Sequence, residues 1–335
     1  KAIYKVGSNN SLELVKEAER GADLVLEIDI NMQIKVEEII KEEMLKAKKT
    51  ANTEFYKESY ALISDPATGS IKALAGIRLI TNGVNSSFQD VSINVIKNAY
   101  TVGSAVKGAS MAVGYKNGII DIGTNITDGC VKLANMPAKC SYKRLGRLND
   151  VEALALSSNY YQFIIALGIM GYNYTYNMEA EASMEHFNLY RNTFAEFGLG
   201  AMTGIDLPNE SSGLKGTTIA PDLLMNLAIG QYDLYTPVEL LQYINTIASS
   251  GTRYSLSLMN RVIKDEKILL EHTKKVLNHV ELEDKYIKRI QEGFHSVMKN
   301  GTGYWYINPS IPAAGKTGTS ESYIDNDLDG NLESF

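Results

Sequence analysis

The chain has 335 residues, of which 44% are hydrophobic and 21% are charged. This length and composition suffice for one large or two moderate domains with a buried core. The formal net charge of −6 offers no basic surface of the kind that binds nucleic acid, so we expect no nucleic-acid partner. No apolar stretch approaches the roughly 18 residues that a membrane span requires.

The first part of the sequence alternates between strand and helix patterns. A short apolar strand is expected at residues 24–29, and residues 30–48 have the 3.6-residue apolar period of an amphipathic helix. Residues 60–64 and 70–75 are strand candidates. The sequence Asp-Pro-Ala-Thr-Gly at 65–69 suits a tight hairpin turn between them.

Helices dominate the middle of the chain, from residue 102 to about residue 247. The elements expected after them are a strand pair at 257–263 and 268–270, a helix at 284–299 and a short strand at 314–319. The predicted fold class is therefore α/β (α+β), with an antiparallel sheet flanked by helices and a large all-helical subdomain at about residues 78–250.

A serine and a lysine at the expected start of a helix form the first candidate catalytic pair. Gly103 permits a tight turn, and the sequence from Ser104 onward has a helical pattern. Three residues are nearly one helical turn, so Ser104 and Lys107 lie on one face. A serine hydroxyl becomes a useful nucleophile when a neighbouring base takes its proton, and a helix N-terminus stabilises a developing oxyanion. The structural alternative for Ser104 is a plain helix N-cap.

The same Ser-x-x-Lys spacing occurs twice more in the chain. Ser212 and Lys215 lie in a Gly/Ser loop, whereas Ser296 and Lys299 lie inside an expected amphipathic helix. Neither serine stands at the start of a helix, so the local context favours Ser104.

Two further strings follow in the sequence. Ser157-Ser-Asn159 comes directly after a helix expected at 149–156, and its structural alternative is simply the end of that helix. Lys316-Thr-Gly-Thr319 lies on the expected strand, where the threonines are alternatively ordinary sheet residues. A catalytic interpretation is favoured because it explains all three strings together.

In this order the strings are the Ser-x-x-Lys, Ser-x-Asn and Lys-Thr-Gly signature of penicillin-binding proteins and serine β-lactamases. The chain most resembles the transpeptidase domain of a class B penicillin-binding protein, over approximately residues 24 to 322. The further strings that carry this resemblance are Leu26–Gln33, Asp65–Leu74, Phe197–Glu210, Ala228–Gln231 and Gly301–Gly303. One departure is Val102, which stands where the family usually has proline. The resemblance implies a penicillin-binding-protein/serine β-lactamase-like fold.

The resemblance also implies a role for each motif residue. Ser104 would attack the penultimate D-Ala of a peptidoglycan stem peptide, and β-lactams would acylate the same residue. Lys107 would be its base, or alternatively a protonated structural lysine bonded to Asn159. Ser157 would relay a proton to the leaving nitrogen, and Lys316 would hold that serine in a positive field. Asn159 would bind the peptide amide of the substrate.

The third string supplies the implied substrate-binding residues Thr317, Gly318 and Thr319. The two threonine hydroxyls would bind the terminal carboxylate. The backbone N–H groups of Ser104 and Thr319 would form the oxyanion hole. This serine mechanism requires no cofactor.

Two cysteines, Cys130 and Cys140, lie between the first two motifs. They predict either a disulfide, free thiols or part of a structural zinc site. Because zinc takes about four ligands, Asp128 and a distant histidine such as His186 would have to complete that site.

We expect residues 1–23 to be the tail of an N-terminal pedestal region. Residues 24–335 would be the transpeptidase domain, without the last strands and the C-terminal helix of the family. The resemblance implies the extracytoplasmic face of a bacterial membrane, an N-terminal anchor outside this chain and a membrane glycosyltransferase partner. A serine β-lactamase, a β-lactam sensor domain and a non-catalytic scaffold of a cell-wall synthesis complex are the alternative functions.

Overall fold

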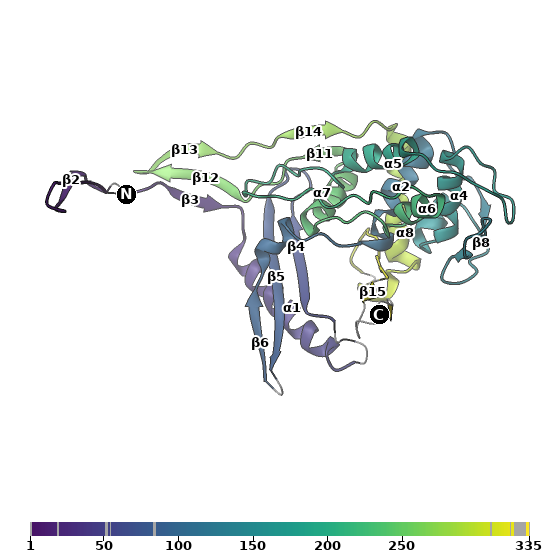
Figure 1. Cartoon of the computed structure of the whole chain (residues 1–335), viewed down its shortest axis with the longest axis horizontal. Coiled ribbons are helices and arrows are strands. Elements are labelled where there is room, and N and C mark those ends of the chain that lie inside the picture. Colours follow the sequence, from purple (N-terminus) through teal and green to yellow (C-terminus); the bar gives the residue numbers. More distant parts are fainter. Residues whose placement is uncertain are drawn as a thin grey trace.

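The computed structural model describes residues 2–18, 20–50, 53, 55–82, 85–308, 310–321, 323–324 and 333–334. The molecule is elongated, with the N-terminal strands at one end and a helical body at the other (Figure 1). Its helices are α1 (Ile30–Ala47), α2 (Lys107–Lys116), α3 (Asp150–Ala155), α4 (Asn159–Ile169), α5 (Met184–Phe197), α6 (Pro221–Ala228), α7 (Pro237–Ala248) and α8 (Asp284–Asn300). The short 3-10 helices are η1 (Ser92–Ile96), η2 (Gly103–Val106) and η3 (Tyr304–Tyr306).

All pairings between the strands are antiparallel. The strands are β1 (Ile3–Val6), β2 (Leu12–Lys16), β3 (Asp23–Leu26), β4 (Glu58–Ser64), β5 (Ile71–Asn82), β6 (Asn85–Asp90), β7 (Ile126–Thr127), β8 (Cys130–Val131), β9 (Lys139–Cys140), β10 (Arg147–Leu148), β11 (Thr252–Tyr254), β12 (Met259–Lys264), β13 (Lys267–Glu271), β14 (Val276–His279), β15 (Tyr323–Ile324) and β16 (Glu333–Ser334).

Helix α1 packs against the sheet β4–β5–β6 (Figure 1). Ile40 and Met44 of α1 are buried together with Ala75, Ile77 and Leu79 of β5, which matches the apolar period predicted for this helix. Strand β5 is longer than predicted and β6 follows it, so the helical region begins at η1 and not near residue 78. Strand β6 was missed because its largely polar sequence lacks the alternation that indicates a half-buried strand.

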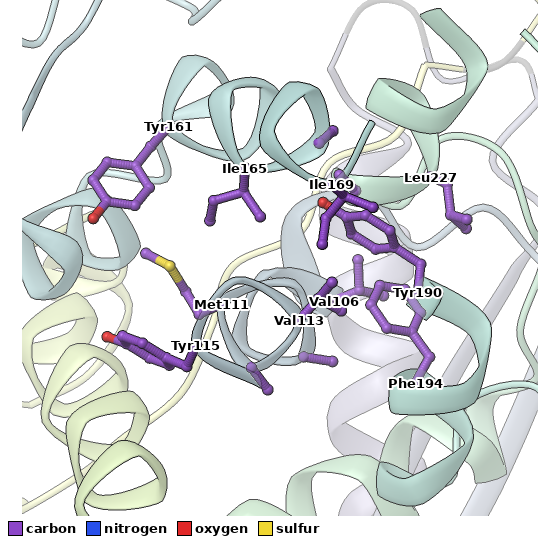
Figure 2. Close-up of a cluster of buried hydrophobic side chains, with 14 of the residues drawn as sticks. Val106, Met111, Val113, Tyr115, Tyr161, Ile165, Ile169, Tyr190, Phe194 and Leu227 are labelled. Carbon is purple, nitrogen blue, oxygen red and sulfur yellow. The ribbon is translucent and has the colours of Figure 1, made fainter. Parts of the chain in front are cut away.

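Helix α2 forms the centre of the helical body. Every residue from Lys107 to Tyr115 is buried, and α4, α5 and α8 pack around the helix. Figure 2 shows side chains of α2, α4 and α5 converging in this core, among them Val113, Ile169 and Phe194. Because α2 is enclosed on all sides, its polar residues are buried as well.

Helix α3, which ends just before Ser157, is fixed to α8 by an ion pair. Arg289 of α8 donates from Nε and Nη2 to the two carboxylate oxygens of Asp150, at 2.7 and 2.8 Å. The Tyr115 hydroxyl donates to the same carboxylate at 2.5 Å. The Asp150 side chain has no exposed surface, so this ion pair connects α2, α3 and α8 inside the core.

Two details of the predicted fold are wrong. The helical region is not all-helical, because two short strand pairs, β7–β10 and β8–β9, interrupt it. The stretch 314–319 is not a strand: Gly315 donates its N–H to the carbonyl of Phe294 in α8, at 3.0 Å. A strand requires a neighbouring strand for its ladder, and among the described residues this stretch has none.

The N-terminal hairpin β1–β2 is exposed throughout, whereas β3 joins β12 and β13 in a second sheet. The division of the chain at residue 23 stays a prediction. Among the described helices, none has both the length and the apolarity that crossing a membrane demands.

Replacing Asp150 by alanine should lower the free energy of unfolding by about 3–5 kcal/mol, because it leaves the Arg289 guanidinium without its main partner. The matched control is Glu292→Ala, which removes the exposed partner of the same arginine and should cost at most about 1 kcal/mol. Denaturant unfolding of both variants measures the difference, and equal losses would contradict the role given to the buried pair.

Candidate active site

The first motif lies at the junction between η2 and α2. Ser104 is half-buried in the 3-10 turn, and Lys107 is the first residue of α2. The predicted helix therefore begins with a tighter turn than an α-helix, but the serine and the lysine keep their spacing of one turn. Of the other two Ser-x-x-Lys serines, Ser296 donates its hydroxyl to Asn300 within α8.

Close backbone packing connects the first motif to the third. Gly103 has φ +54°, and a Cβ at this position would lie 2.1 Å from the carbonyl oxygen of Thr319. Its N–H donates to the carbonyl of Gly230 at 2.9 Å. A Cβ on Gly318 would lie 2.6 Å from the carbonyl oxygen of Val102. Glycine is the residue that adopts the positive φ of Gly103 without strain. At both positions a residue with a Cβ atom would clash with the facing carbonyl oxygen.

The amine of Lys107 connects the first motif to the second. The side chain has no exposed surface. Its Nζ donates to the carbonyl oxygen of Ser157 at 2.7 Å and to Oδ1 of Asn159 at 2.6 Å, and it lies 3.3 Å from the Ser157 hydroxyl. Both close acceptors are oxygens that cannot donate.

The Ser157 hydroxyl lies between two lysine amines. Lys316 Nζ donates to it at 2.9 Å and to the carbonyl oxygen of Thr317 at the same distance. Burial, and then the nearby Lys316 ammonium, lower the pKa of Lys107 well below its ordinary value, although the Asp128 carboxylate opposes the shift. Burial lowers the pKa of Lys316 to about 7. The site therefore disfavours the charged form of both lysines.

Ser157 itself has an unusual backbone conformation. Its φ of +58° lies in the left-handed region that non-glycine residues rarely adopt. Such a conformation costs about 1–3 kcal/mol and persists where the surroundings hold it in place. It occurs in the short turn between α3 and α4, and it directs both the carbonyl and the hydroxyl of Ser157 toward the lysines.

A cavity of about 1050 Å³ lies over these groups. Five residues of the three motifs line it: Ser104, Ser157, Asn159, Thr317 and Thr319. Gly318 is packed against the first motif, as its contact with Val102 indicates. The structure thus brings together every residue of the three strings to which the sequence analysis gave a role.

Two residues of the cavity wall have contacts that the sequence analysis did not anticipate. The Thr302 hydroxyl lies 2.7 Å from the Thr317 hydroxyl, and Gln231 Nε2 donates to the carbonyl oxygen of Thr319 at 3.5 Å. Both residues stand in strings that carried the family resemblance. That was their only signal, because nothing in the spacing connects them to the third motif.

The two cysteines form a disulfide between β8 and β9. This pairing contradicts the zinc and free-thiol alternatives for Cys130 and Cys140, because zinc binds reduced thiolates. His186, the distant candidate ligand, accepts the N–H of Ser183 at the start of α5. In the described ranges, no group of three or more His, Cys, Asp or Glu side chains is arranged to hold a metal ion.

The fold and the geometry of the three motifs are those expected of a penicillin-binding-protein transpeptidase domain. Residues 59–333 match the family model of the penicillin binding protein transpeptidase domain, so the chain belongs to this family. The predicted resemblance to the transpeptidase domain of class B penicillin-binding proteins is confirmed, and so is the predicted α/β fold class.

Penicillin-binding protein 2A of Bacillus subtilis is 35% identical over 327 residues, which cover 95% of this chain and 46% of that protein. Peptidoglycan D,D-transpeptidase MrdA of Acinetobacter baumannii is 25% identical, over 91% of this chain and 45% of that protein. The chain thus spans about half the length of the curated relatives it matches.

Solved structures show the same fold. The structure of penicillin-binding protein 2B from Streptococcus pneumoniae strain R6 has a TM-score of 0.87 and 27% identity, over 99% of this chain and 56% of that one. A structure entitled "Structural coordination of polymerization and crosslinking by a peptidoglycan synthase complex" has a TM-score of 0.69 at 20% identity, over 95% of this chain and 57% of that one.

Replacing Gly103 by alanine should separate the first and third motifs. The added Cβ would overlap the Thr319 backbone, so backbone amides of residues 316–320 should exchange with solvent faster than in the unaltered protein. Hydrogen exchange measured by mass spectrometry reports on this segment directly.

The control for this variant is Gly118→Ala. Gly118 has φ +66° and open space around its Cβ position, so alanine there should cost only about 1–2 kcal/mol of backbone strain. It should leave exchange at 316–320 unchanged. Equal exchange in the two variants would contradict the packing argument.

Proposed function

We propose that this chain is a serine D,D-transpeptidase, which cross-links peptidoglycan stem peptides through an acyl-enzyme on Ser104 and is acylated there by β-lactams. The observation that carries the proposal is the environment of the Lys107 amine, which is fully buried and hydrogen-bonded to the second motif. A neutral amine has two N–H donors and one lone pair. In a neutral Lys107 the two close acceptors, Ser157 O and Asn159 Oδ1, take both donors. The lone pair is then available for a hydroxyl proton, and the longer 3.3 Å contact is one in which the Ser157 hydroxyl donates.

In the first step, Ser104 Oγ attacks the carbonyl carbon of the penultimate D-Ala and gives its proton to Lys107. The negative charge on the former carbonyl oxygen is stabilised by the backbone N–H groups of Ser104 and Thr319. Within the described part of the chain, neither N–H donates to another protein group. Such a donor contributes on the order of 3 kcal/mol to the transition state.

In the second step, the bond from the carbonyl carbon to the D-Ala nitrogen breaks. The nitrogen takes a proton through the Ser157 hydroxyl, which lies between Lys107 and Lys316 and so connects the base to the leaving group. Hydroxyls of Thr317 and Thr319 on the cavity wall bind the terminal carboxylate. An amine of a neighbouring stem peptide then attacks the ester, which forms the cross-link and frees Ser104.

The cellular setting is part of the proposal. We place the domain at the extracytoplasmic face of a bacterial membrane, held by an N-terminal anchor outside this chain. The Cys130–Cys140 disulfide fits such an oxidising compartment. The likeness to the peptidoglycan synthase complex, together with the family resemblance, supports a membrane glycosyltransferase partner. The mechanism uses no cofactor.

Intact-mass spectrometry after incubation with benzylpenicillin tests the nucleophile. The unaltered protein should gain one covalent adduct that persists for hours, and Ser104→Ala should lower the rate of adduct formation by at least about 10³-fold. The control variant Ser296→Ala should react like the unaltered protein. Rapid turnover to penicilloate would instead indicate a β-lactamase, and no adduct on the unaltered protein would indicate a non-catalytic scaffold.

The pH dependence of acylation tests the role of the two lysines. Because Lys107 must be neutral to accept a proton, the acylation rate should fall as pH falls through its lowered pKa. Lys316→Gln removes a cation that helps to lower the pKa of Lys107. The acid limb of the pH–rate profile, where the acylation rate falls at low pH, should therefore move to higher pH, and the maximal rate should fall. Lys116→Gln, at the other end of α2, should leave the limb in place. An unchanged limb in Lys316→Gln would contradict the assignment of Lys107 as the base.

A further inference from the structure

The backbone of Asn159 is hydrogen-bonded to a group of side chains outside the three motifs. The Ser141 hydroxyl oxygen accepts the backbone N–H of Asn159 at 3.0 Å and that of Tyr160 at 3.1 Å. The same hydroxyl donates to Oδ2 of Asp128 at 2.7 Å, and the Ser158 hydroxyl donates to this oxygen at 2.6 Å. These contacts lie at the N-terminus of α4, where Asn159 is the first helical residue.

The Asp128 carboxylate determines which way the two hydroxyls point. A carboxylate only accepts hydrogen bonds, so both serine protons are directed to Asp128 and the oxygen lone pairs remain for the helix. Ser158 uses its oxygen to accept the N–H of Tyr161 at 3.0 Å. The first three amides of α4 are therefore satisfied by two hydroxyls that Asp128 orients, and its negative charge lies at the favourable end of the helix dipole.

This group of side chains is largely buried, and its burial lowers the stability of the fold. Ser158 has no exposed surface and Ser141 is 9% exposed. The second carboxylate oxygen of Asp128 is buried and has no hydrogen-bond partner among the described residues. A buried carboxylate that is incompletely paired costs stability, so its presence next to the second motif calls for a function.

The disulfide lies next to this group in the chain. Cys130 lies two residues after Asp128, Cys140 lies directly before Ser141, and their bond joins β8 to β9. The carbonyl oxygen of Cys140 also accepts the Asn159 side chain, from Nδ2 at 3.4 Å. Both cysteines are exposed to solvent, so a small reductant has access to the bond.

We propose that Asp128 and Ser141 are positioning residues that set Asn159 against Lys107, and that the Cys130–Cys140 disulfide keeps both of them in place. They act through Asn159, whose Oδ1 is the nearest acceptor of the Lys107 amine. This inference rests on the proposed acyl-enzyme function of the same site. It adds a dependence of acylation on the redox state of an exposed disulfide.

The Ser141 variants test the positioning role. Ser141→Ala removes the acceptor for two amides and should lower the rate of acylation by benzylpenicillin about tenfold. Ser141→Thr keeps the hydroxyl and should restore the rate to within about twofold of the unaltered protein. Thermal unfolding of both variants verifies that they are folded. Equal rates in Ser141→Ala and the unaltered protein would overturn the proposal.

Asp128→Asn provides a readout that a merely structural role would not move. The charged groups that face Lys107 are Lys316, of the third motif, and Asp128, in the loop before β8. Removal of the carboxylate removes the charge that raises the pKa of Lys107. The acid limb of the acylation rate should therefore move to lower pH, opposite to its shift in Lys316→Gln. A lower rate with an unmoved limb would overturn the role of Asp128.

Reduction tests the disulfide. Dithiothreitol supplies two electrons and two protons, leaves as its cyclic disulfide, and converts Cys130 and Cys140 to thiols. The reduced protein should acylate several-fold more slowly, and the double variant Cys130→Ser/Cys140→Ser should be equally slow and insensitive to the reductant. An unchanged rate after complete reduction, verified by thiol alkylation, would overturn this part.

Hydrogen exchange at the start of α4 separates this inference from the proposed function. Amides of Asn159 and Tyr160 should exchange faster in Ser141→Ala and after reduction, whether or not the protein is acylated. If the unaltered protein is not acylated, the proposed function fails and the exchange measurement alone decides the positioning role. Unchanged exchange in both samples would overturn it.

Discussion

Lys107 carries an amine with no exposed surface into the centre of the helical body, where an unpaired ammonium would cost several kcal/mol. The surrounding helices make this burial unavoidable, because the whole first stretch of α2 is enclosed. Its protonation is thereby disfavoured, and two oxygens of the second motif fix its direction. The base of the proposed reaction is thus a consequence of core packing, and the remaining site is arranged around it.

Backbone contact rather than side-chain contact holds the third motif beside the first. Gly103 and Gly318 each approach the other segment's backbone so closely that a methyl group would collide with a carbonyl oxygen. This contact places Thr317 and Thr319 on the cavity wall and brings the amine of Lys316 to the Ser157 hydroxyl. The glycines in these motifs therefore have a steric function that is separate from the chemistry of their neighbours.

The second motif is supported from two sides. Helix α3 is fixed to α8 through Asp150 and Arg289, and α4 is capped by the hydroxyls that Asp128 orients. Ser157 lies between these supports in a left-handed conformation that a flexible turn would not retain. The strain at Ser157 and the incompletely paired carboxylate of Asp128 are local costs, and the large apolar core of the helical body offsets them.

Local patterns determined much of this protein. The period of apolar residues in α1 and α8, the hairpin turn at 65–69 and the order of the three strings depend only on neighbours in sequence, so the sequence predicted them. The tertiary structure decided what depends on distant residues. Examples are the absence of a strand at 314–319, the polar strand β6, the pairing of Cys130 with Cys140, and the approach of Asp128 and Ser141 to Asn159. These follow from ladder partners, burial and contacts across long chain separations, which no local pattern of residues encodes.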